Sequence, residues 1–373
     1  MSPITVVILI FAMLGALDLI LGNKVGMGAE FKKAFEIFCP MVLSMLGMIV
    51  LAPAIGVWLT PMFTGFYNLF HIDPSIIPAA ILANDMGGAT LAQAICLSPE
   101  IGNYNAFVVS SMMGCVISFT IPFALGMVKK EQQSDLFFGL LCGIATIPVG
   151  CFVSGLICGI SPLTLIVTLL PLIVFSLIVG AALIFVPKIC IKCFTVFGTF
   201  MKTLSLVGLA CAMFTFLSGV QINPHFDTFE NGAFVCANAC VTLAGALPLM
   251  FILTKLLSKP LNKLGGKIGI DATSAVSLLA TTVTSTPTFG VMDKMNKKGT
   301  VLNAAFATSA SFALGSHLAY TMVFDGSFAV PMIVGKLISG VAAVLLALLI
   351  YKEKHPTQTS EESSENNEKE YAI

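Results

Sequence analysis

Two apolar stretches with polar centres decide the fold: residues 74–97, PSIIPAAILANDMGGATLAQAICL, and residues 270–292, IDATSAVSLLATTVTSTPTFGVM. The polar centre is NDMGG at 84–88 in the first and TSTPT at 284–288 in the second. Glycine pairs and proline interrupt helices, and irregular backbone inside lipid must be buried in protein or face water. We therefore expect two broken, re-entrant hairpins whose polar tips lie near the membrane midplane, where carriers place their sites.

The composition assigns the rest of the chain to the membrane. Of the 373 residues, 57% are hydrophobic and 10% are charged, whereas soluble domains carry about 25% charge. Apolar runs of about 20 residues are long enough to cross the hydrocarbon as helices. The sequence predicts an all-α polytopic membrane protein with about nine transmembrane helices, near residues 3–21, 37–58, 106–127, 136–157, 163–186, 196–219, 233–255, 301–324 and 331–351.

The distribution of lysine predicts the topology. All 19 basic residues are lysine, and positive charge is retained in the cytoplasm. The lysine-bearing loops are 22–36, 129–135, 187–193, 255–269, 293–299 and the tail. The loops without lysine are 59–73, 98–105, 158–162, 220–232 and 325–330. If the two broken stretches re-enter, every lysine-bearing loop is cytoplasmic; if both cross fully, three such loops lie outside. We therefore expect re-entrance, with the N-terminus outside and the C-terminus in the cytoplasm.

Two lysines lie within predicted spans. Lys202 and Lys336 are each close enough to a helix end to reach water by extending the side chain, so we expect both to do so.

An offset of about 198 residues aligns the two halves of the chain. It aligns the two broken stretches and also Asn105 with Asn303. Four spans and a hairpin per half, joined by a single span, would make the halves inverted repeats, as in many carriers. The predicted units are 1–157, with hairpin 74–97; the linker span 158–193; 194–351, with hairpin 270–292; and a disordered acidic cytoplasmic tail, 352–373. The alternative is that two sets of membrane helices resemble each other by chance.

The first hairpin supplies the strongest site candidate. Asp85 is a carboxylate at midplane depth, where ionisable groups are costly and mark function by default. It would pair with an ammonium group, a sodium ion or a proton, with Asn84 offering a donor and an acceptor beside it. Gly87 and Gly88 allow close backbone approach, and Thr90 follows on the same stretch. The alternative is that Asp85 only caps the following half-helix.

The second hairpin and one later span supply weaker candidates. Hydroxyls and a helix-breaking proline would face the first hairpin: Thr284, Ser285, Thr286, Pro287 and Thr288. These hydroxyls could instead satisfy one another. His317 and Tyr320 share one helix face and are candidates to line a path, although a packed histidine explains the pattern equally well.

The sequence contains no complete motif for metal or cofactor binding, catalysis or nucleic-acid binding. The pair Cys190 and Cys193 has metal-like spacing, but no second pair completes a site, so we expect no metal and no cofactor. No nucleophile, phosphate-loop or nucleic-acid signature is present, and we expect no enzyme activity. The absence of arginine, the residue that clamps carboxylate and phosphate, favours a neutral or cationic solute.

The chain resembles the ethanolamine utilisation membrane proteins, the EutH-type ethanolamine permeases. The resemblance covers residues 1–351 and is carried by ILANDMGGAT at 81–90, STPTFGVMDKMNKKGT at 285–300 and NAAF at 303–306. It implies a bacterial inner-membrane protein that takes up ethanolamine for use as a carbon and nitrogen source. No residue roles come with it; by the reasoning above, Asp85 would hold the ammonium group, and Asn84 with Thr284–Thr286 the hydroxyl.

Several alternatives stay open. A sodium- or proton-coupled carrier of another small polar metabolite would show the same hairpins. A membrane enzyme or assembly protein is a more distant alternative. The sequence does not distinguish carrier from channel, and it leaves the coupling ion, the affinity and the oligomeric state, a homo-oligomer included, undetermined.

Overall fold

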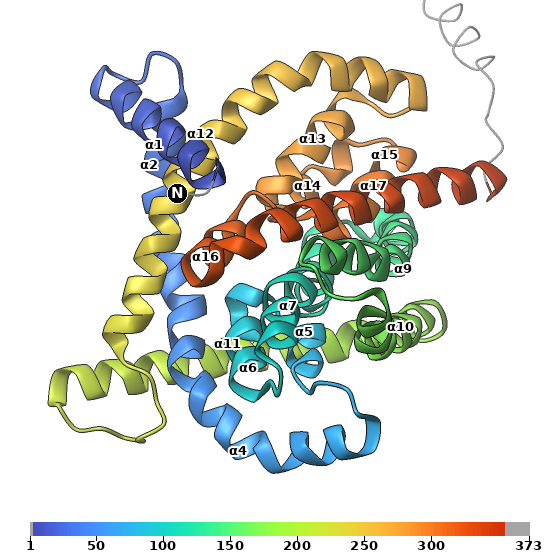
Figure 1. Cartoon of the computed structure of the whole chain (residues 1–373). Coiled ribbons are helices and arrows are strands. Elements are labelled where there is room, and N and C mark those ends of the chain that lie inside the picture. Colours follow the sequence, from blue (N-terminus) through green and yellow to red (C-terminus); the bar gives the residue numbers. More distant parts are fainter. Residues whose placement is uncertain (1–2, 355–373) are drawn as a thin grey trace, which may run out of the picture.

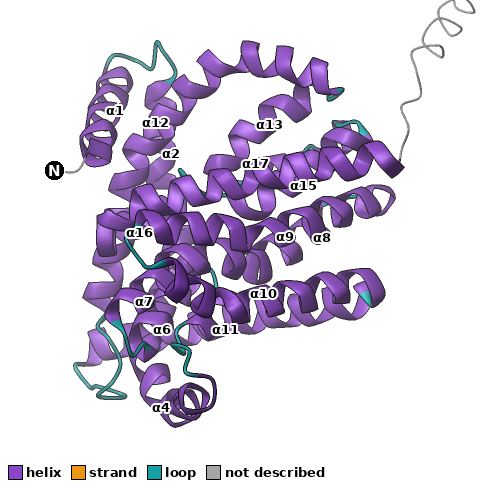
Figure 2. Cartoon of the chain, turned by 45° about the vertical axis from the view of Figure 1, so that its right-hand side comes forward, coloured by secondary structure: helices purple, strands orange, loops and turns teal. Residues whose placement is uncertain are grey.

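The computed structural model describes residues 3–354 and is all-helical over that range (Figures 1 and 2). Within this range, eight helical segments are long and apolar enough to cross a membrane: Pro3–Ile20, Met27–Leu59, Pro99–Met127, Lys130–Ile157, Pro162–Phe185, Pro187–Ser218, Phe229–Ile268 and Ser316–Tyr351. The prediction of an all-α, multi-pass membrane protein is confirmed. The predicted tail lies outside the described residues from position 355 onward.

In the first half, the elements are α1 (Pro3–Ile20), α2 (Met27–Glu36), α3 (Phe38–Met41), η1 (Val42–Leu46), α4 (Gly47–Phe70), α5 (Ile76–Ile81), η2 (Asn84–Met86), α6 (Gly88–Ile95), α7 (Pro99–Tyr104), η3 (Asn105–Gly114), η4 (Val116–Thr120), α8 (Ile121–Met127), η5 (Lys130–Gln132) and α9 (Gln133–Ile157). In the second half, they are α10 (Pro162–Phe185), α11 (Pro187–Ser218), α12 (Phe229–Ile268), α13 (Ala272–Val283), α14 (Thr286–Gly290), η6 (Met292–Lys294), α15 (Lys297–Ala310), α16 (Ser316–Asp325), η7 (Gly326–Phe328) and α17 (Ala329–Lys354).

The predicted span 301–324 is wrong as a continuous helix. It is divided into α15 and α16 by an irregular stretch at 311–315, in which Phe312 has a left-handed backbone with φ 61°. The freed amides bond to α13: the Phe312 N–H donates to the Thr281 carbonyl at 3.3 Å, and the Leu314 N–H to the Thr282 carbonyl at 2.8 Å. Carbonyl groups of α13 thus accept hydrogen bonds from backbone N–H groups that lipid could not satisfy.

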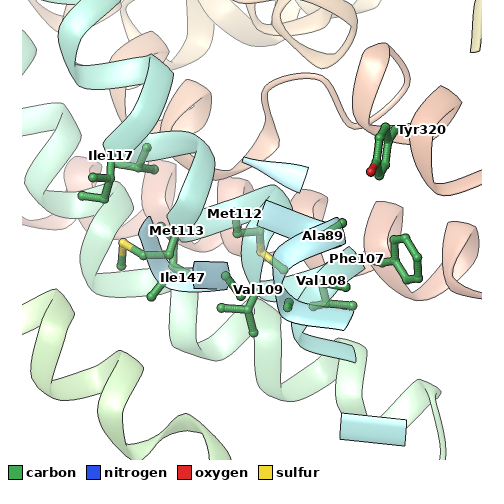
Figure 3. Close-up of a cluster of buried hydrophobic side chains, with 14 of the residues drawn as sticks. Ala89, Phe107, Val108, Val109, Met112, Met113, Ile117, Ile147 and Tyr320 are labelled. Atoms are coloured by element: carbon green, nitrogen blue, oxygen red, sulfur yellow. The ribbon is translucent and has the colours of Figure 1, made fainter. Parts of the chain in front are cut away.

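The predicted span 106–127 is helical but not uniformly α. The wider π-helical turns η3 and η4 lie between α7 and α8, and π turns inside helices often accompany functional sites. Every residue of η3 is buried. Figure 3 shows its side chains, among them Phe107, Met112 and Met113, in the hydrophobic core.

The two ends of stretch 74–97 are held together by one aspartate. The Asp73 carboxylate accepts hydrogen bonds from the backbone N–H groups of Leu97 at 3.0 Å and Ser98 at 2.9 Å. Its other oxygen accepts from the Ser75 N–H at 3.0 Å and the Ser75 hydroxyl at 2.6 Å. The chain therefore leaves this stretch beside the point where it entered.

Stretch 270–292 is closed in the same manner. The Asp271 carboxylate accepts from the Asn296 N–H at 2.8 Å and the Ser274 N–H at 2.9 Å. Beyond each closure, a fully buried asparagine side chain reaches back to the start of the hairpin. Asn105 donates to the Ser75 hydroxyl at 2.9 Å, and Asn303 to the Ser274 carbonyl at 3.0 Å.

Each hairpin follows a long helix that contains two prolines. These are Pro53 and Pro61 in α4, and Pro248 and Pro260 in α12. Figure 1 shows the last part of α4 along the lower edge of the molecule and the last part of α12 along the upper edge. The two helices therefore end near opposite edges of the molecule in this view.

Candidate functional site

A cavity of about 390 Å³ lies where the two broken stretches meet the break between α15 and α16. Three predicted site residues line it: Asp85 from the first stretch, Thr284 from the second, and His317 at the start of α16. Its other walls are largely apolar. They come from α2, α3, η1, the π-helical run (η3 and η4 with Cys115 between them) and α12, and from residues next to the three site residues. The lining residues are Lys33, Ile37, Pro40, Met41, Ser44, Met45, Ala83, Met86, Cys115, Phe119, Leu243, Leu247, Val283, Phe312, Gly315 and Ser316.

The glycine pair positions Asp85. Gly87 has φ 95°, a left-handed backbone that other residues rarely adopt. A Cβ atom at Gly88 would lie 2.1 Å from the Leu82 carbonyl oxygen, so only glycine fits. This tight turn directs the Asp85 side chain, which is 15% exposed, toward the cavity. Asp85 does not cap α6, whose N-cap is Gly87 with no side-chain hydrogen bond.

Asn84 is fully buried and joins the first hairpin to α16. Its side-chain amide donates to the His317 carbonyl at 3.4 Å and to the Thr321 hydroxyl at 3.5 Å. Its oxygen accepts the Asp85 N–H at 2.9 Å. In this conformation Asn84 therefore holds Asp85 in place.

Lys336 is the functional candidate that the sequence argument missed. It was expected to extend toward water, but it is 1% exposed, and its ammonium group donates to the Ser111 carbonyl. The Lys336 Nζ atom lies 3.2 Å from His317 Nδ1, and His317 Nε2 lies 3.7 Å from Asp85 Oδ1. A carboxylate, an imidazole and an amine thus form a line that crosses from η2 through α16 to α17.

The second hairpin contributes less than expected. Thr284 faces the cavity, whereas Thr286 and Pro287 are exposed and lie off it. Thr288 is buried, and its hydroxyl is 2.7 Å from that of Thr281, as the alternative of mutually satisfied hydroxyls expects. The buried Ser285 hydroxyl has no hydrogen-bond partner among the described residues.

The last two predicted residues, Thr90 and Tyr320, also lie outside the cavity lining. The Thr90 hydroxyl donates to the Gly87 carbonyl at 3.2 Å, an interaction within the turn of the first hairpin. Tyr320 is buried and stacks on Phe324, with ring centroids 4.5 Å apart.

Two aromatic rings, those of Phe119 and Phe312, form a further part of the cavity lining. Phe119 and Phe312 meet edge to face at 5.3 Å between ring centroids, and Phe312 lies 5.1 Å from the His317 ring. A cation over an aromatic face is attracted by the ring quadrupole. A carboxylate and aromatic rings in the lining of one cavity suit a small organic cation. Within the described residues, no group of three histidine, cysteine or acidic side chains could hold a metal ion.

The fold and the cavity define a multi-pass membrane protein with a buried polar site at helix breaks, the construction used by many secondary transporters. The chain belongs to the family described as "Ethanolamine utilisation protein, EutH", whose profile matches residues 2–350.

Full-length relatives support the assignment. The "Probable ethanolamine permease EutH" of Listeria monocytogenes serotype 1/2a is 38% identical over 356 residues, covering 94% of this chain and 95% of that protein. The protein of the same name from Escherichia coli K12 is 32% identical over 362 residues, with 91% and 89% covered. The "Uncharacterized protein YxeR" of Bacillus subtilis is 34% identical, with 90% and 91% covered. No solved structure matches.

Proposed function

We propose that this protein transports ethanolamine, as its ammonium ion, into the bacterial cytoplasm across the inner membrane, and that it has no enzymatic role. The observation that carries the proposal is the Asp85 carboxylate, turned by a glycine-dependent break into a cavity at the junction of the broken helices. The relatives named as probable ethanolamine permeases give the substrate.

The chemistry of the cavity suits ethanolammonium. The ammonium group would lie against Asp85 and the faces of Phe119 and Phe312, which together offset its lost hydration. The hydroxyl would bond to Thr284 or Ser316 on the same wall. The remaining predicted contacts, Asn84, Ser285 and Thr286, would require the hairpins to move during the transport cycle.

We further propose that the two halves are inverted repeats with re-entrant hairpins. The Asp73 carboxylate closes one hairpin by accepting from the Ser98 N–H, and the Asp271 carboxylate closes the other by accepting from the Asn296 N–H. Asp271 lies 198 positions after Asp73, and Asn296 lies 198 positions after Ser98. The left-handed residues that end α4 and α12, His71 and Gly269, obey the same offset. Agreement in capping chemistry at a single offset supports a repeat over chance resemblance.

Contacts between loops support the proposed topology, with the N-terminus outside and the C-terminus in the cytoplasm. Lys129 Nζ lies 2.9 Å from Asp293 Oδ2, and the Gln132 amide donates to the Met292 carbonyl at 2.6 Å. The hydrogen bond between the two side chains lowers the pKa of Asp293 and raises that of Lys129. Two lysine-bearing loops assigned to the cytoplasm are therefore in direct contact. The central cavity reaches Lys33, in a third such loop, so this conformation would be open inward.

Uptake of labelled ethanolamine by Asp85 variants tests the proposal. In mildly acidic medium little uncharged amine leaks through lipid, so uptake reports the protein. We expect Asp85→Asn and Asp85→Ala to lower uptake at low substrate by about 100-fold or more, because removing one partner of a buried charge pair costs about 3–5 kcal/mol. Glu100→Gln, at an exposed carboxylate, is the matched control.

Wild-type rates in both Asp85 variants, at matched expression, would remove the carboxylate from the site. Uptake of labelled ethanolamine that excess unlabelled ethanolamine does not reduce would be leakage through lipid and would contradict ethanolamine as the substrate. Uptake that an excess of another small polar metabolite reduces more strongly would favour that metabolite. Saturation and counterflow measurements distinguish a carrier from a channel.

A further inference from the structure

Lys336 is a cation in the protein core without a direct anionic partner. It is 1% exposed, and in the described part of the chain no carboxylate lies within 4.0 Å of its ammonium group. An isolated buried charge is costly, so its compensating charge must act through a neighbour.

His317 is that neighbour. An ammonium group can only donate, so His317 Nδ1, 3.2 Å from Lys336 Nζ, must accept. The remaining imidazole proton then lies on Nε2, the ring nitrogen that is 3.7 Å from Asp85 Oδ1. One neutral imidazole links the positive end of the line to the negative end.

The charge of this line is balanced only when the site is empty. Lys336 contributes one positive charge, Asp85 one negative charge, and His317 none. An ethanolammonium ion at Asp85 would leave two cations for one carboxylate in a setting of low dielectric constant. Loss of one proton restores the balance.

We propose that Lys336 competes with the substrate for the charge of Asp85, so that binding of each ethanolammonium ion expels one proton from Lys336 through His317. This inference rests on the proposed function, since it assigns the coupling ion of the same site.

The step conserves atoms and charge. Lys336 Nζ passes a proton to His317 Nδ1, and His317 Nε2 releases its own proton to water in the cavity that it lines. Lys336 is left as a neutral amine, His317 as the other neutral tautomer, and the water as hydronium. On substrate release the reverse transfer recharges Lys336.

The other groups around the line do not replace this role. Those that face Lys336 or Asp85 from the π-helical run, α9 and α16 are thiols, a hydroxyl and a phenol: Cys115, Cys151, Ser316 and Tyr320. All are uncharged near neutral pH in their ordinary state.

The exchange has a consequence for energetics. One cation enters as one proton leaves, so the full cycle moves no net charge, and the membrane potential does not drive it. The empty carrier, with Lys336 charged, is electrically balanced and can reorient.

Calorimetry on the purified full-length protein tests the proposal. Ethanolammonium chloride is titrated at pH 7 into protein in phosphate and, separately, in HEPES, whose ionisation enthalpies differ. The difference in heat gives the number of protons released per ligand bound. We expect about one proton for the wild type, with affinity rising up to about tenfold per pH unit.

The variants locate the source of the proton. Lys336→Met and Lys336→Gln should bind without releasing a proton and with little dependence on pH; glutamine keeps a donor for the Ser111 carbonyl if methionine impairs folding. Lys202→Met removes another lysine within a span, an exposed one, and should release the proton as the wild type does.

Wild-type binding without proton release overturns the inference but leaves the transport proposal standing. Proton release that persists in a Lys336 variant overturns it as well, because the proton then comes from elsewhere. No binding heat in any wild-type titration, whatever the buffer, contradicts the proposed function itself.

Discussion

At the scale of single residues, the cavity is suited to a cation by rings as well as by charge. Phe119 and Phe312 both line it and are in edge-to-face contact at 5.3 Å between centroids. A desolvated cation–ring contact is worth about 1–2 kcal/mol. Phe119→Leu should therefore weaken ethanolammonium binding by roughly five- to thirty-fold, as measured by calorimetry.

Phe123→Leu is the control for this prediction. Phe123 stacks on Phe119 at 4.9 Å but does not line the central cavity, so the variant should bind as the wild type does. Equal loss in both variants would mean that packing, and not the ring face, accounts for the effect.

The sequence predicted one charged member of the site and missed the other, for a physical reason. Asp85 lies beside a glycine pair in an apolar stretch, where a short side chain cannot reach water. Lysine has a long stem that often extends to the interface. Whether Lys336 does so depends on the packing of α17 against α9 and η3, which bury it. Sequence alone does not contain that packing.

At the scale of elements, the broken helices hold one another. The end of α13 and the break before α16 lie so close that a Cβ atom at Gly315 would be 2.0 Å from the Val283 carbonyl oxygen. Gly315→Ala should push these elements apart, lower the thermal stability by about 1–3 kcal/mol and reduce uptake. Thermal unfolding in detergent and uptake at matched expression measure the two effects.

Gly290→Ala provides the comparison. The nearest atom to a Cβ atom there is the flexible end of Met127 at 3.5 Å, an ordinary contact. Stability and uptake should stay close to the wild type. A Gly315→Ala protein as stable and active as Gly290→Ala would show that the close approach is not needed.

The sequence predicts two of these helix breaks but not the third. Glycine in NDMGG at 84–88 and proline in TSTPT at 284–288 predict helix interruptions. The structure has them: α5 and α6 are separate helices, and so are α13 and α14. The break at 311–315 has a single glycine and no proline. It exists because α13 accepts its backbone N–H groups, a tertiary effect that local sequence does not encode.

At the scale of the whole molecule, transport by inverted repeats requires that the hairpins enter from opposite faces. Residues 98–105 should then face outward and residues 293–299 the cytoplasm, in contact with the loop of Lys129.

In a background whose native cysteines are replaced, Glu100→Cys should react with an impermeant maleimide on intact cells, and Lys297→Cys only after permeabilisation. Both positions are exposed, so a failure to react reports the side of the membrane and not burial. The cysteine-free parent, unlabelled in both conditions, is the control. Labelling of both positions on intact cells, or of neither, would place the two hairpins on one face and contradict the inverted arrangement.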